Sequence, residues 1–149
     1  MTPIRVFFDA SVLFAAGYSN AGYARDLIRL AVRGQLRVIV SQDVLDEVDR
    51  NMGRKAPERV EAYRELLGLI DLEIVPDPTK EAVWAVEEYV VQKDAPIVAA
   101  AINAQPDYLV TYDRRHLIDP PEVAANSGLN IVTPEVIVKA AGAGDESLI

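Results

Sequence analysis

The chain has 149 residues, 50% of them hydrophobic and 26% charged, with a formal net charge of −8, which is ordinary for one globular domain. Cysteine is absent and His116 is the single histidine, so disulfides and thiolate metal sites are excluded. Because there is a single histidine, a histidine zinc site or a Ser-His-Asp triad is poorly supported. The acidic balance disfavours broad binding to nucleic-acid backbone, but it allows a local cationic rim.

Nothing in the sequence predicts contact with a membrane. No apolar run approaches the ~20 residues that a membrane span needs. Arg5 and Asp9 interrupt the apolar stretch near the start, which is therefore unlike a signal peptide. We expect a cytoplasmic protein.

Apolar runs alternate with amphipathic segments along the chain, and this predicts alternating strands and helices. Strands are predicted over 4–9, 36–40, 72–75, 108–111 and 130–132. Helical segments are predicted over 11–16, 23–33, 42–53, 79–92 and 97–102, with two more opening at Pro57 and at Pro134, the last ending near Gly142. The pattern indicates a three-layer α/β/α fold with a mostly parallel central sheet, formed by one domain over 1–142 and followed by a loose tail over 143–149.

Three details of these helices are also predicted. Ser41 and Thr133 stand where helix N-caps are expected. Trp84 is expected to pack against the core, since tryptophan is usually well buried.

Four acids fall where the predicted fold brings them to one edge of the sheet. Asp9 and Asp113 come directly after predicted strands, Glu47 lies at the margin of an apolar helix stripe, and Asp94 opens a helix. Each acid taken alone has a plain alternative, as a helix cap, a turn former or a surface charge. Together at the carboxyl edge, where α/β sheets bind ligands, they are harder to explain as structure alone.

Clustered carboxylates repel one another unless a cation neutralises them. With no cysteine and one histidine, the ligand set favours a hard ion such as Mg²⁺ or Mn²⁺. Ser11 and Thr111 place hydroxyls next to Asp9 and Asp113, where they are expected to support the ligands from a second shell.

Four segments resemble the signature blocks of PIN-domain ribonucleases, in the family's order and spacing. They are VFFDASVLFAA, SQDVLDEVDR, KDAPIVAAA and DYLVTYDRRHL, and the resemblance covers residues 6–134. It implies a PIN-like fold in which Asp9, Glu47, Asp94 and Asp113 form the catalytic and metal-binding cluster of a Mg²⁺- or Mn²⁺-dependent endoribonuclease. The branch that it resembles most consists of VapC-like toxins, which implies a cognate antitoxin as partner, single-stranded RNA as substrate and a homodimer.

The sequence departs from the family pattern at two places. The family commonly has Asn two residues after the first Asp, where this chain has Ser11. It also often has an additional acid before the third block, where this chain has Val90, Val91 and Gln92.

Cations next to the acids are candidates for holding RNA phosphates. Arg114, Arg115 and His116 follow Asp113 directly, and Arg50 follows Glu47 by three residues. A solvated rim is the alternative for each of them. Two tyrosines, Tyr18 and Tyr112, are candidates for base stacking or for packing.

Two other functions compete with the ribonuclease. An aspartate phosphotransferase needs a second acid two residues after Asp9, and Ser11 occupies that position. A catalytically inactive PIN-like module that binds RNA or protein is the other alternative, and four clustered acids argue against it because a scaffold gains nothing from their repulsion.

Overall fold

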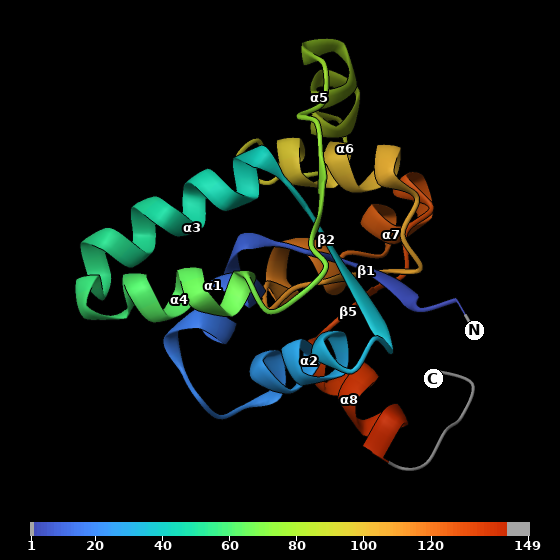
Figure 1. Cartoon of the computed structure of the whole chain (residues 1–149). Helices are drawn as coiled ribbons and strands as arrows, with labels where there is room; N and C mark the ends of the chain where they lie inside the picture. The colour runs from blue at the N-terminus through green and yellow to red at the C-terminus, as the bar shows by residue number, and fades with distance from the viewer. Residues whose placement is uncertain (1, 143–149) are drawn as a thin grey trace.

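The computed structural model, which describes residues 2–142, is built on a five-stranded sheet in which every strand pair is parallel (Figure 1). The strand order is β3-β2-β1-β4-β5. The strands are β1 (Ile4–Phe8), β2 (Leu36–Ser41), β3 (Glu73–Val75), β4 (Tyr108–Val110) and β5 (Ile131–Val132). The order reverses between β1 and β4, and sheets of this type bind ligands at such a switch point. The predicted mostly parallel sheet is confirmed.

The register of the two central strands brings their following residues together. Val6, Phe7 and Phe8 of β1 are fully buried, as expected of a strand covered on both faces. Phe8 pairs with Val110 of β4, and the Asp9 amide donates to the Val110 carbonyl at 3.2 Å. The segments that carry Asp9 and Asp113 therefore leave the sheet side by side.

Helices cover both faces of the sheet, which confirms the predicted α/β/α layering (Figure 1). In the view of Figure 1, α2 and α8 lie below the sheet and α6 and α7 lie above it. The helical elements are α1 (Ala10–Tyr18), α2 (Tyr23–Val32), α3 (Gln42–Lys55), η1 (Pro57–Arg59), α4 (Val60–Leu67), α5 (Lys80–Glu87), α6 (Ala95–Ala104), η2 (Arg114–Ile118), α7 (Pro121–Ser127) and α8 (Pro134–Gly142). No helix within residues 2–142 is both long and apolar enough to cross a membrane.

The helix α1 packs closely against α3 and α4, and a glycine makes this possible. A Cβ atom on Gly17 would lie 2.6 Å from Cδ1 of Tyr63 on α4 and 3.1 Å from Cε of Met52 on α3. Only a residue without a side chain fits there. The contact fixes α1 relative to α3. Asp9 is the N-cap of α1 and Glu47 lies on α3, so the contact also fixes the positions of these two acids relative to each other.

Several boundaries differ from the predictions because local contacts extend or end a helix. The predicted helical turn over 11–16 is the longer helix α1, since Asp9 caps it and Gly17 continues it. The predicted helix over 79–92 ends at Glu87, and turns lead from there to Asp94. The sequence pattern missed α7 and η2, which are short and carry little periodicity.

Two side-chain predictions were wrong. Trp84 has 59% of its surface exposed. Its helix α5 stands at the edge of the fold (Figure 1). Thr133 does not cap α8, since its buried Oγ1 atom has no hydrogen-bond partner among the described residues. Ser41 caps α3 as predicted, accepting from the Val44 amide at 3.3 Å. The predicted tail over 143–149 lies outside the described residues.

Candidate active site

The site begins with Asp9, a carboxylate that is buried at the switch point of the sheet. Only 7% of the residue is exposed, and isolated charges are costly to bury. Three groups donate to it. The Val12 amide and the Ser11 hydroxyl donate to Oδ1 at 3.1 and 2.6 Å, and the Thr111 hydroxyl donates to Oδ2. Asp9 is thus both the N-cap of α1 and a fixed anion at the edge of the sheet.

The two hydroxyls also connect Asp9 to the segment after β4. The Ser11 Oγ atom accepts from the Tyr112 amide at 3.2 Å, and the Thr111 Oγ1 atom accepts from the Asp113 amide at 2.9 Å. Each hydroxyl donates to the carboxylate and accepts from the backbone. The hydroxyls of Ser11 and Thr111 therefore hold the Asp9 carboxylate in place, and their predicted role of supporting metal ligands stays a prediction.

A second group of ligand-type side chains gathers around Asp113. Single ligand atoms of Asp94, Asp113 and His116 all lie within 4.8 Å of one another. Asp113 caps η2, since its Oδ1 accepts from the His116 amide at 3.0 Å, and its Oδ2 lies 3.0 Å from the His116 Nδ1. Asp94 precedes α6 without capping it, and its buried Oδ2 has no hydrogen-bond partner within residues 2–142.

The surroundings shift the pKa values of these acids in different directions. Burial raises the pKa of Asp9, although the Ser11 and Thr111 hydroxyls offset part of the effect. Burial also raises the pKa of Asp94 to about 6, and the Asp113 charge adds to it against the opposing charges of Lys93 and His116. Burial acts in the same direction on Asp113, but the hydrogen bonds and charge of His116 outweigh it and lower the pKa.

Glu47 completes the set of predicted acids from α3. It is half-buried, and its negative charge contributes to the raised pKa of Asp9. Asp9 with Glu47 and Asp94 with Asp113 are therefore two acid pairs, which Thr111 connects through its hydrogen bonds to Asp9 and to the Asp113 amide.

The predicted RNA-binding cations occupy different positions. Arg114 and Arg115 are exposed on η2, next to the acids, and Arg50 is exposed on α3. His116 instead lies within the acid cluster, on Asp113. The sequence reasoning missed this contact, although an Asp and a His three residues apart after a strand indicate a capped helical turn.

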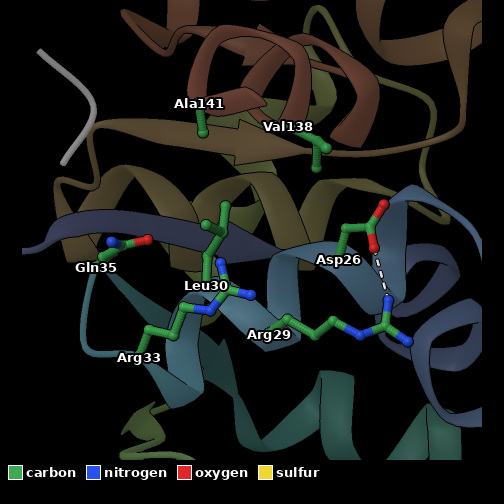
Figure 2. A pocket seen from close by; sticks show the side chains of 7 residues that line it. All are labelled: Asp26, Arg29, Leu30, Arg33, Gln35, Val138 and Ala141. Carbon is green, nitrogen blue, oxygen red and sulfur yellow. Dashed lines mark hydrogen bonds and ion pairs between the residues drawn. The ribbon is translucent and has the colours of Figure 1, made fainter. Parts of the chain in front are cut away.

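Two pockets of the described residues lie on either side of α2, away from these acids. One pocket, of about 270 Å³, lies between α2 and α8 and is drawn in Figure 2. Its Arg29 is paired with Asp26 at 2.6 Å, and Arg33 is its other cation. This pocket is lined by a single acid, Asp26. The edge of the sheet that carries Asp9, Asp94 and Asp113 therefore remains the candidate active site.

Comparison with known proteins identifies the family and the fold of the chain. The family model of the PIN domain matches residues 5–115. PAE2754 from Pyrobaculum aerophilum has a similar structure, with a TM-score of 0.62 and 20% identity over 93% of this chain and 90% of that chain. A toxin-antitoxin complex from Klebsiella pneumoniae has a TM-score of 0.60 and 19% identity, over 87% of this chain and 97% of that chain. VapC20 from Mycobacterium tuberculosis has a TM-score of 0.54 and 17% identity, over 74% of this chain and 91% of that chain.

These structures share an α/β/α fold with the chain at low sequence identity. The chain belongs to the PIN domain family, because the family model covers most of its length. No match was found among curated protein sequences.

The donor set fits a hard divalent cation. Asp9, Glu47, Asp94 and Asp113 offer carboxylate oxygens, which Mg²⁺ and Mn²⁺ prefer. The buried Asp94 Oδ2 without a partner is the atom that most needs a cation. His116 is a further ligand-type group within the cluster.

Asp94 provides a test that needs no substrate. Its folded pKa of about 6 exceeds the ordinary 3.8, so the protonated carboxyl stabilises the fold below pH 4 and this contribution is lost as the pH rises through 6. The free energy of unfolding of the parent should therefore fall relative to Asp94→Asn between pH 4 and 7, by on the order of 1–2 kcal/mol after solvent screening. Urea unfolding across this range measures it.

Asp49→Asn, at an exposed acid of α3, is the matched control and should leave the pH profile of the parent unchanged. Mn²⁺ at ~100 times its dissociation constant should stabilise the parent by ~2.7 kcal/mol and Asp94→Asn by much less. Equal destabilisation of Asp94→Asn at every pH, with and without Mn²⁺, would show that Asp94 is only structural.

Proposed function

We propose that this PIN domain is a Mg²⁺- or Mn²⁺-dependent endoribonuclease that hydrolyses phosphodiester bonds of single-stranded RNA. We propose further that it is the toxin of a toxin-antitoxin pair. The observation that carries the first proposal is the meeting of Asp94, Asp113 and His116 within 4.8 Å, with an unpartnered Asp94 oxygen among them. Membership of the PIN family supports the reaction class.

The residues of the chain have separate roles in this proposal. Asp9, Asp94, Asp113 and Glu47 would hold the cation through their carboxylates. When bound, Mg²⁺ or Mn²⁺ lowers the pKa of a water and stabilises negative charge on the leaving oxygen. Ser11 and Thr111 keep Asp9 from rotating, because each hydroxyl holds one carboxylate oxygen.

The carboxyls of Asp94 and Asp113 have different pKa values. Burial raises the pKa of Asp94 to about 6, so a cation held by this carboxyl would have to displace its proton below that pH. Asp113, with its lowered pKa, remains ionised, and His116 orients it through Nδ1 and the backbone amide. The two carboxyls thus differ in protonation because of their surroundings.

Removal of the acids should abolish cleavage while the fold remains. Asp94→Asn and Asp113→Asn should each slow cleavage of a single-stranded RNA by at least about a hundredfold, and EDTA should do the same to the parent. The measurement is a gel assay with Mn²⁺ or Mg²⁺, with Asp49→Asn as a control that should cut at the parent rate. Parent-like cleavage in EDTA would refute the metal mechanism, and RNA binding without cleavage would favour an inactive PIN-like module.

The exposed arginines of η2 should hold phosphates next to the acids. Replacing Arg114 and Arg115 by Ala should weaken RNA binding and lower the slope of log affinity against log salt by about 1–2, because fewer counterions are released. The control removes the same charge elsewhere, through Arg64→Ala with Lys80→Ala on α4 and α5. A slope equal to the parent's for the η2 variant would assign these arginines to the surface alone.

A protein partner and a homodimer are part of the same proposal. Solved structures with this fold include a toxin-antitoxin complex and VapBC2 from Rickettsia felis, which supports an antitoxin partner. The chain's charge of −8 suits a cationic segment of that partner. Light scattering at micromolar concentration should give twice the monomer mass of 16.3 kDa, and a strict monomer would refute the dimer.

A further inference from the structure

A pair of aromatic side chains lies on α1, the helix that Asp9 caps. Phe14 and Tyr18 are four residues apart and therefore share one face of the helix. Their rings are stacked, with centroids 5.7 Å apart and planes inclined by 13°. Phe14 packs partly against the core, whereas Tyr18 has 53% of its surface exposed. The stack thus has one anchored ring and one that faces water.

Cations from three other elements contact the helix that carries this stack. The Lys55 Nζ atom, at the end of α3, lies 5.8 Å from the centre of the Phe14 ring. Arg59 of η1 donates to the Gly17 carbonyl at 3.4 Å, and Arg25 of α2 donates to the Ala16 carbonyl at 2.9 Å. None of these three cations forms an ion pair with a carboxylate within residues 2–142. In a chain of −8 this is a local positive surface.

The combination matches a single-stranded nucleic acid better than a protein segment. Such strands are bound by aromatic side chains that stack on bases, next to cations that follow the phosphates. A protein segment would bury an aliphatic surface, and uncompensated cations next to it would oppose burial. The stacked rings and the cations without ion-pair partners therefore favour a ligand that has planar bases and negatively charged phosphates.

The position of the stack relates it to the acids. Along α1, Ala10 and Tyr18 are eight residues apart, which is about 12 Å of helix. At about 3.4 Å per stacked nucleotide, this distance corresponds to roughly three or four nucleotides. A strand whose phosphate lies at Asp9 would reach Tyr18 with a base a few nucleotides away.

We propose that Phe14, Tyr18 and Lys55 form a subsite that stacks a base of single-stranded RNA a few nucleotides from the bond that is cut. This subsite rests on the proposed ribonuclease function and adds to it a place where the strand is held by its bases. Tyr18 supplies the exposed ring, Phe14 fixes that ring in a stacked orientation, and Lys55 contributes positive charge.

The test separates bases from phosphates. Binding of an oligouridine of about twelve nucleotides and of an abasic oligomer of equal length and charge is measured by fluorescence anisotropy in EDTA, so that nothing is cut. The proteins are the parent, Tyr18→Phe, Tyr18→Leu and, as a control, Trp84→Ala. Trp84, which is 59% exposed against 53% for Tyr18, belongs to α5. In Figure 1, α5 lies far from α1. Thermal melts establish that each variant folds.

Tyr18→Leu, which keeps the apolar bulk but loses the aromatic face, should bind oligouridine about 5- to 100-fold more weakly than the parent. It should bind the abasic oligomer as the parent does, because no base stacks there. Tyr18→Phe and Trp84→Ala should match the parent on both oligomers. In cleavage assays with Mn²⁺, Tyr18→Leu should raise KM and leave kcat unchanged.

The outcomes distinguish failure of the proposed base-stacking subsite from failure of the proposed ribonuclease function. If the parent cuts and binds RNA but Tyr18→Leu binds both oligomers like the parent, the subsite is refuted while the ribonuclease stands, and the stack is left for a protein partner. An equal loss on both oligomers would also refute stacking, since only charge or shape would then have changed. If the parent neither binds nor cuts RNA, the proposed function fails and the subsite fails with it.

Discussion

The buried carboxylate of Asp9 is the interaction on which the arrangement of the site depends. A charge with 7% exposure must be satisfied by donors, and here the donors come from both sides of the switch point. Val12 and Ser11 belong to α1, and Thr111 follows β4. One anion therefore caps the first helix and holds the ends of the two central strands together, so its geometry is fixed before any ligand binds.

This dependence gives Asp9 and Asp94 different meanings as experimental probes. An amide at position 9 would turn one acceptor oxygen into a donor that faces hydroxyls already donating to it, so both folding and metal binding would suffer. Asp94 has a buried oxygen without a partner and does not cap its helix. Loss of its charge removes the cost of burying a carboxylate, which stabilises the fold without metal. It also removes a metal ligand, which lowers the stabilisation that a cation would give. Asp94 is the residue at which structure and function separate cleanly.

Much of the fold followed from the sequence because periodicity and strand ends are local signals. The buried run of β1, the Ser41 cap and the placement of acids at strand ends could be predicted without coordinates. The position of His116 on Asp113 was missed, since it depends on a π-helical turn that no periodicity marks and that only the Asp113 cap signals. Trp84 was misjudged because burial of α5 depends on its place at the edge of the fold, which residue type does not encode. That Asp9, Glu47, Asp94 and Asp113 hold Mg²⁺ or Mn²⁺ stays a prediction.

The serine at position 11, where the PIN family commonly has Asn, is explained by the hydrogen bonds that it makes. Its hydroxyl donates to Asp9 at 2.6 Å and accepts from the Tyr112 amide at 3.2 Å, so a single atom joins the start of α1 to the segment after β4. A hydroxyl is suited to this because it donates and accepts at the same oxygen, whereas an amide needs two separate atoms. Thr111 does the same between Asp9 and the Asp113 amide. The site therefore holds its central carboxylate with two equivalent hydroxyl bridges, and the remaining acids are left free of hydroxyl partners to meet a cation.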